Sequence, residues 1–232
     1  HKLHHGDLHT FAEFNSIQLN DTHPVIGIPE LIRLLKQEGL SFDDAWAIVR
    51  KTFAYTNHTI LAEALEKWEI SIFQFLFPEI LDIIKEINDR FRHEMSERGV
   101  HPGAIEYMSI INNGQVHMAW LACYAAYSIN GVAQLHTNIL IRETLHDWYA
   151  VYPEKFSNKT NGVTPRRWLR NCNPELAELL TDLQGNDNWV SQLSDLEKLL
   201  AYKDDKEVLR RLSEVKYSRK LKVAEFVEKA EG

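Results

Sequence analysis

The run "VHMAWLACYAAYSI", residues 116–129, constrains the fold most, because it is apolar nearly all round. In a soluble protein, a helix without a polar face has to be enclosed by other elements. The chain therefore needs a sizeable core, and 232 residues with 44% hydrophobic and 10% aromatic content can supply one. We expect a buried helix that ends at Asn130-Gly131.

A strand–loop–helix unit is predicted near the start of the chain. Ile17–Leu19 is a short apolar strand, and a polar loop follows it as far as Pro24. The segment "IPELIRLLKQEGL" predicts a helix with Pro29 at its first position and Gly39 as its end. In "SFDDAWAIVRKTFAY" we expect a second helix that a capping box opens, with Ser41 as N-cap and Asp44 three residues later.

Helical patterns dominate the rest of the chain. We expect a helical turn in "AEALEKW", a long helix from Pro78 to Gly99, and a helix in "VAQLHTNILIRETL". Residues 145–162 read as a loop with aromatic anchors, and a helix follows with Thr164 as N-cap. The C-terminal third is charged and helical. An α/β layer fold and a helical bundle both fit this pattern.

Composition excludes several classes of protein. A net charge of −7 argues against a general nucleic-acid binder, which needs clustered cations. The two cysteines, Cys123 and Cys172, lack metal or redox spacing and favour a reducing compartment. No apolar run approaches the roughly 20 residues of a membrane helix, so we expect a cytoplasmic protein without a membrane partner. No metal is expected either, because no cysteine or acidic spacing supports the histidines at positions 1, 4, 5 and 9.

Three polar segments are candidate sites. Asp21 and His23 follow the first strand, where side chains can enter a crevice at the edge of a sheet; a simple turn is the alternative. His58 and Glu66 lie in "NHTILAEALEKW", whose donors and acceptors suit sugar hydroxyls. Here the alternative is a capped helix with solvated glutamates.

The third segment, "TNGVTPRRW", places Arg166 and Arg167 at the start of a helix with Trp168 as a flat wall beside them. Helix N–H groups and guanidiniums together favour an anion. Alternatively, the two arginines form ion pairs with acidic residues across an interface, and Trp168 belongs to the core.

Taken together, the motifs resemble the α-glucan phosphorylases. The segments "IQLNDTHP", "AYTNHTILAEALEKW", "NGVAQLH", "PEKFSNKTNGVTPRRWL" and "CNPELAELL" stand in the order found in that family, from Ile17 to the C-terminus. The resemblance implies an α/β, GT-B-type fold with two Rossmann-like domains across a cleft. It implies that residues 1–161 are the end of the first domain and that residues 162–232 lead into the second.

The resemblance also implies an activity. Inorganic phosphate would attack the terminal glucose of an α-1,4-glucan with retention, and glucose 1-phosphate would be released. Pyridoxal phosphate would be the cofactor and contribute its phosphate group to proton transfer. The whole enzyme would be a homodimer.

Site residues carry over from the resemblance by motif. His58 would contact the 6-hydroxyl of the glucosyl unit, and Asn161 would lie beside both sugar and cofactor. The pocket next to the glucose would be lined by Asp21, His23, Glu66 and Val132. Near the cofactor, Trp168 would lie against it, and Arg166 and Arg167 would belong to the wall of an anionic site.

Parts of the family pattern are absent from the sequence. It has neither the glycine-rich phosphate loop nor a lysine in the cofactor-lysine motif, so the resemblance implies an internal piece of a phosphorylase. We expect this piece alone to be inactive and to hold no covalent cofactor. Two alternatives remain: a non-catalytic helical module that binds glucan or protein, and a glucan-active transferase that uses a sugar nucleotide.

Overall fold

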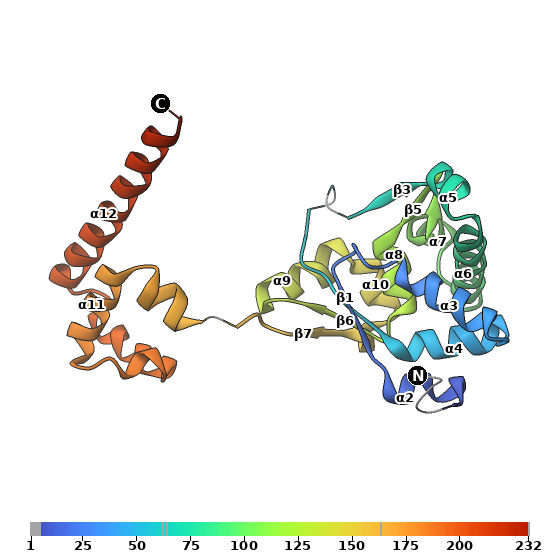
Figure 1. Ribbon diagram of the computed structural model, residues 1–232, viewed down its shortest axis with the longest axis horizontal. Helices are drawn as coiled ribbons and strands as arrows, with labels where there is room; N and C mark the ends of the chain where they lie inside the picture. Colours follow the sequence, from blue (N-terminus) through green and yellow to red (C-terminus); the bar gives the residue numbers. More distant parts are fainter. Residues whose placement is uncertain (1–5, 62, 64, 163, 232) are drawn as a thin grey trace. The chain divides into compact units, whose positions relative to one another are not determined.

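The computed structural model describes residues 6–61, 63, 65–162 and 164–231. The chain divides into two compact units, His1–Asn161 and Gly162–Gly232, called unit 1 and unit 2 (Figure 1). Which parts of the expected two-domain fold these units represent stays a prediction.

A four-stranded parallel sheet forms the centre of unit 1. Its strands lie in the order β1 (Ile17–Asn20), β2 (Phe53–Thr56), β6 (Ser128–Gly131) and β7 (Phe156–Asn158). Because all neighbours pair in parallel, the carboxyl ends of the four strands lie at one edge of the sheet. Within this sheet β1 and β7 are the outer strands. The predicted α/β class is confirmed.

Of the four strands in this sheet, only β1 is predicted from the sequence. The helical pattern runs on through Phe53–Tyr55, whereas the structure ends α4 (Phe42–Thr52) one residue earlier. In the same way, the buried helix was expected to continue to Asn130, but residues from Ser128 onward form β6. Parallel strands are buried on both faces and lack alternation, so a short apolar run does not distinguish them from a buried helix.

The helices between β1 and β2 match the prediction closely. Helix α3 (Gly27–Gln37) begins two residues before Pro29, and Gly39, with a φ of 95°, follows its end. At the start of α4, the Ser41 hydroxyl accepts from the Asp44 N–H at 3.1 Å and donates to the Asp44 carboxylate at 2.6 Å. The capping interaction expected from the sequence is therefore present.

A small antiparallel sheet joins β3 (Lys67–Glu69), β5 (Gln115–His117) and β4 (Ile111–Asn112). The helical turn predicted through Trp68 is wrong, because Trp68 pairs with Val116 in this sheet. Long-range pairing outweighs local helix propensity here.

Helix α6 (Pro78–Glu97) confirms the helix predicted from Pro78. It begins at the proline, and its apolar face is buried at Ile80, Ile83, Ile84 and Ile87. Shorter helices flank it: α5 (Ile70–Leu76) and α7 (Pro102–Met108).

The predicted buried helix is confirmed as α8 (Met118–Ala125), in which every residue is buried. Lys155 closes its carboxyl end: the Lys155 ammonium donates to the carbonyls of Cys123 at 3.0 Å and Tyr124 at 2.9 Å. Helix C-termini leave such carbonyls without intrahelical partners, so this buried lysine joins the start of β7 to α8.

The remaining elements of unit 1 are short. They are a 3₁₀ turn (Leu8–Thr10), α2 (Phe11–Phe14), α9 (Gln134–Ile139), a π-helical turn (Leu140–Thr144), α10 (His146–Val151) and a 3₁₀ turn (Pro153–Lys155). The helix predicted after Val132 is thus present as α9 with its π-helical extension.

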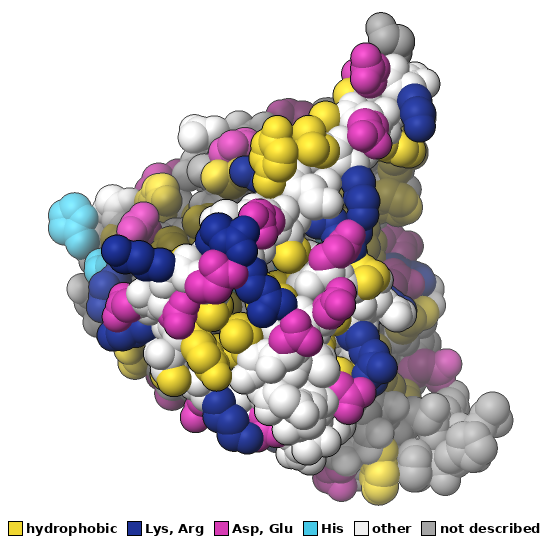
Figure 2. Space-filling view, turned by 90° about the vertical axis from the view of Figure 1, so that its left-hand side faces the viewer, with side chains coloured by type: hydrophobic (Ala, Val, Ile, Leu, Met, Phe, Trp, Pro, Cys, Tyr) yellow, Lys and Arg dark blue, Asp and Glu magenta, His cyan; other side chains and the backbone are white. Residues whose placement is uncertain are grey.

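Unit 2 is helical, as expected. It contains a π-helical segment (Arg166–Asn171), α11 (Pro174–Gln184), 3₁₀ segments (Asn188–Val190 and Leu193–Tyr202) and α12 (Lys206–Glu231). Its small core is formed by Ala177, Leu180 and Trp189. In the space-filling view, Lys and Arg side chains are interspersed with Asp and Glu side chains (Figure 2). None of the helices in the described part of the chain combines the length and the apolar character that a membrane span requires.

Candidate functional site

The candidate site of unit 1 lies at the carboxyl edge of the parallel sheet. Asp21 follows β1, Asn57 and His58 follow β2, and Val132 follows β6. The pairing Thr56 with Asn130 brings the ends of β2 and β6 side by side. Ligands of open α/β sheets bind at such edges.

Backbone hydrogen bonds hold the loops of this edge together. The Asp21 N–H donates to the Thr56 carbonyl, the Asn57 N–H to the Asn130 carbonyl, and the Asn161 N–H to the Val132 carbonyl, each at 2.9 Å. These hydrogen bonds link each loop to its neighbour in the order β1, β2, β6 and β7. The predicted site residues of unit 1 therefore belong to one connected edge.

Asp21 has a left-handed backbone conformation with a φ of 62°. Aspartate tolerates this region better than most residues, and the Asp21 carboxylate accepts from the Thr22 N–H at 2.9 Å. The turn predicted as the alternative to a site is thus present. This turn is compatible with a site, because it only changes the direction of the chain between β1 and His23.

His23 and Glu66 lie together, with 3.3 Å between His23 Nδ1 and Glu66 Oε1. Thr22, which is fully buried, donates its hydroxyl to Glu66 Oε2 at 2.6 Å. The loop after β1 and the segment before β3 are joined by these contacts. Sequence reasoning missed Thr22, because its partner is 44 residues away.

His58 is exposed, whereas its neighbour Asn57 is completely buried. The Asn57 side chain donates to the Tyr55 hydroxyl at 3.0 Å, which anchors the loop immediately before His58. The loop before His58 is therefore anchored, while the exposed side chain of His58 is accessible to a ligand.

His136 is a second residue that sequence reasoning missed. It lies in the first turn of α9, and its Nδ1 accepts from the Val132 N–H at 3.1 Å. Burial lowers the pKa of His136, and the nearby charge of His58 lowers it further. The only signal in the sequence is its place in "NGVAQLH", next to the predicted residue Val132.

The residues expected near the cofactor divide between the two units. Asn161 is the last residue of unit 1 and is exposed. Arg166, Arg167 and Trp168 lie in the π-helical segment of unit 2, and Trp168 is 61% exposed, so it is not a core residue. Within the described part of the chain, neither arginine side chain has a carboxylate partner. The ion pairs of the alternative interpretation are thus not seen there.

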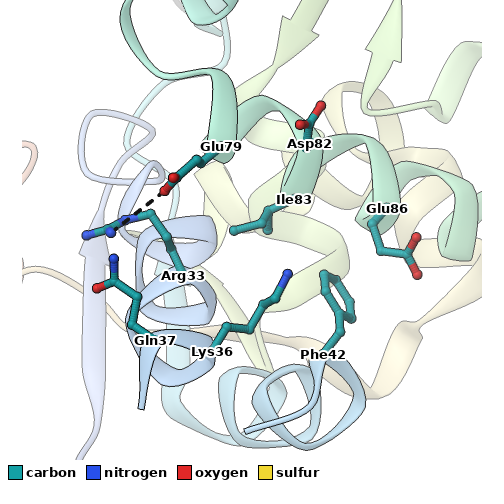
Figure 3. A pocket seen from close by; sticks show the side chains of 8 residues that line it. All are labelled: Arg33, Lys36, Gln37, Phe42, Glu79, Asp82, Ile83 and Glu86. Carbon is teal, nitrogen blue, oxygen red and sulfur yellow. Dashed lines mark ion pairs between the residues drawn. The ribbon is translucent and has the colours of Figure 1, made fainter. Parts of the chain in front are cut away.

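A separate groove lies between α3, α4 and α6 (Figure 3). Arg33 and Lys36 face Glu79, Asp82 and Glu86 across it, and the Arg33 guanidinium is 4.0 Å from the Glu79 carboxylate. Gln37, Phe42 and Ile83 complete the lining. These charges largely neutralise one another, and none of the predicted site residues lies in this groove.

The described residues contain no group of three or more metal-ligating side chains. The histidines at positions 1, 4 and 5 lie outside the described residues, and His9 belongs to the short 3₁₀ turn.

Comparisons with known proteins give a consistent result. The family described as "Carbohydrate phosphorylase" matches residues 1–232. An α-glucan phosphorylase, H isozyme, of Triticum aestivum is 46% identical over 94% of the chain, and a maltodextrin phosphorylase of Streptococcus pneumoniae is 45% identical over 98%. A brain-form glycogen phosphorylase of Bos taurus is 44% identical over 96%. The chain spans only 27%, 29% and 27% of the lengths of these relatives, respectively.

Proposed function

This chain belongs to the carbohydrate phosphorylase family, and from that premise we propose that it forms part of an α-1,4-glucan phosphorylase. The reaction transfers the terminal glucosyl unit of a glucan to inorganic phosphate with retention, and it yields glucose 1-phosphate and a glucan one unit shorter. The relatives named as α-glucan, maltodextrin and glycogen phosphorylases support this assignment.

The connected edge of the parallel sheet is the observation that carries the proposal. It holds an exposed imidazole, His58, and the carboxylates of Asp21 and Glu66 on loops that hydrogen bonds fix to one another. Sugar hydroxyls are both donors and acceptors, and this set offers partners for both roles. We assign His58 to the 6-hydroxyl of the glucosyl unit, and Asp21, His23, Glu66 and Val132 to the adjoining wall.

The cofactor assignment is part of the proposal. Pyridoxal phosphate, when bound, supplies a phosphate group for proton transfer. The donor chemistry fits an anionic group, because Arg166 and Arg167 are exposed and directly precede Trp168, which is also exposed. We assign these three residues and Asn161 to the region around the cofactor.

Two further assignments complete the proposal. Unit 1 is the end of the first domain of the family fold, and unit 2 leads into the second domain, so the chain contributes only part of the cleft. The whole protein is a cytoplasmic homodimer. The binding-module alternative has no observation in its favour, because the named relatives are phosphorylases along nearly all of this chain.

The test measures phosphate-dependent release of glucose 1-phosphate from maltodextrin by the full-length protein that contains this chain. We expect His58→Ala to lower kcat/KM about 10- to 100-fold, since a strong hydrogen bond to the reacting sugar is lost. His93→Ala is the matched control, because His93 is an exposed histidine on α6. The proposal would be contradicted if the wild-type protein showed no phosphorolysis, or if the two variants were equally active.

A further inference from the structure

Glu66, which we assign to the wall of the glucosyl site, is held at both its backbone and its side chain. Its backbone carbonyl accepts from the Met118 N–H at 3.1 Å, at the start of the buried helix α8. Its Oε2 accepts from the Thr22 hydroxyl at 2.6 Å, a distance typical of a hydroxyl that donates to a carboxylate. A glutamate side chain has several rotatable bonds, and these two contacts together favour one of its conformations.

Thr22 is itself fixed by hydrogen bonds of its backbone. The residue is completely buried, its N–H donates to the Asp21 carboxylate at 2.9 Å, and its carbonyl accepts from the Val25 N–H at 3.1 Å. The Asp21 N–H donates in turn to the Thr56 carbonyl at the end of β2. The Thr22 hydroxyl thus belongs to a turn that is tied to the carboxyl edge of the parallel sheet.

The second oxygen of the Glu66 carboxylate lies beside His23. The distance from Glu66 Oε1 to His23 Nδ1 is 3.3 Å, and the side chains are 29% and 74% exposed, respectively. The carboxylate therefore stands between a buried hydroxyl and an exposed imidazole. Because each carboxylate oxygen has two lone pairs, Glu66 can accept a sugar hydroxyl while it keeps its bond to Thr22.

We propose that Thr22 is a positioning residue that holds the Glu66 carboxylate beside His23 in the glucosyl site, an inference that rests on the proposed function. Thr22 is buried and acts through Glu66, without touching the substrate. A carboxylate that is already held in one conformation loses less entropy when it binds a sugar hydroxyl. Supporting bonds of this kind keep a binding group close to its productive position.

Phosphorolysis of maltodextrin by the full-length protein tests this inference. Thr22→Val removes the hydroxyl and keeps the shape of the side chain, and we expect it to lower kcat/KM about 10-fold, as misplacement of a binding group does. Thr22→Ser keeps the donor and should stay within about threefold of the wild-type value.

Thr52→Val is the matched control. Thr52 is as buried as Thr22, and its hydroxyl donates to the Ile48 carbonyl at 2.8 Å within α4. Thr52 directly precedes β2, whereas the candidate site lies at the other end of this strand. Thr52→Val should therefore change kcat/KM less than about twofold, although it too removes a buried hydroxyl.

A double-mutant cycle separates positioning from a general loss of structure. Glu66→Ala alone should lower kcat/KM about 10- to 100-fold, at least as much as Thr22→Val does. In the Glu66→Ala background, Thr22→Val should lower kcat/KM less than about twofold, because the carboxylate that Thr22 positions is absent. All rates are measured at a temperature at which thermal unfolding shows each variant to be folded.

Each result of the cycle is decisive. The inference would be overturned, while the proposed function stands, by an unchanged kcat/KM of Thr22→Val, by equal losses in the two backgrounds, or by a loss in Thr22→Ser as large as that in Thr22→Val. A wild-type protein without phosphorolysis would overturn both. If Thr22→Val does not fold, Thr22→Cys, whose thiol is only a weak donor, takes its place with the same expected losses.

Discussion

At the scale of single residues, the site depends on contacts between distant positions. Asp21, His23, His58 and Glu66 are candidates from the sequence, because their polar side chains follow a strand or stand in a polar segment and their motifs resemble those of the α-glucan phosphorylases; their roles stay a prediction. Thr22 and His136 are not predictable. Their partners are a carboxylate 44 residues away and a backbone N–H whose direction only the fold determines.

Thr22 gives the prediction that belongs to this scale. The variant Thr22→Val keeps the shape of the side chain and removes the buried hydroxyl that donates to Glu66 at 2.6 Å. A hydrogen bond to a charged group contributes about 1.5–3 kcal/mol, so the free energy of unfolding should fall by about that amount in urea titrations.

The control for this variant is Thr160→Val, which removes the hydroxyl that accepts from Asn158 in an exposed loop. Its effect should stay within about 0.5 kcal/mol. The role assigned to Thr22 would be refuted by equal effects of the two substitutions.

At the scale of elements, most helices are predictable and most strands are not. Local sequence patterns predict three features of the helices: the start of α6 at Pro78, the cap of α4 at Ser41 and the burial of α8. In contrast, β2 and β6 continue apolar runs that begin in helices, so periodicity does not reveal where the helix stops. The pairing of the strands, which is not local, decides the boundary.

Lys155 gives a prediction for the junction of α8 and β7. Burial lowers its pKa from 10.5 to about 8, and Arg50 adds to this effect. Between these values the unfolded chain binds a proton that the folded chain does not bind, so stability rises with pH in this window. Relative to Lys155→Met, the wild-type chain should gain up to about 1.4 kcal/mol per pH unit between pH 8 and 10.

Urea unfolding of both proteins at several pH values between 7.5 and 10 measures this gain. The comparison with Lys155→Met is needed because the tyrosines, other lysines and cysteines of the unfolded chain also titrate in this range. Parallel pH dependences of the two proteins would show that Lys155 is not the group responsible.

At the scale of the whole molecule, the family and the α/β class were predictable from the order of the motifs. The structure divides the chain after Asn161 into two compact units, at the boundary that the resemblance implies. The chain spans 27–29% of the length of its three named relatives. The assigned cofactor residues divide between the two units, with Asn161 in unit 1 and Arg166, Arg167 and Trp168 in unit 2.

We therefore expect the isolated 232-residue chain to release no glucose 1-phosphate from maltodextrin and to show no chromophore that borohydride reduces. The reason is that a cleft needs two walls, and binding groups act only when they are held in position around the reacting bond. Phosphorolysis by the purified chain alone would show that the residues present here suffice.

The parallel sheet has a consequence for handling the isolated chain. In the described part of the chain, no further strand pairs with its outer strands, β1 and β7. A free strand edge offers unpaired N–H and C=O groups to any extended chain, including another copy of the same polypeptide. Self-association of this chain on concentration would then proceed by strand addition, and a peptide that pairs with β1 or β7 would suppress it.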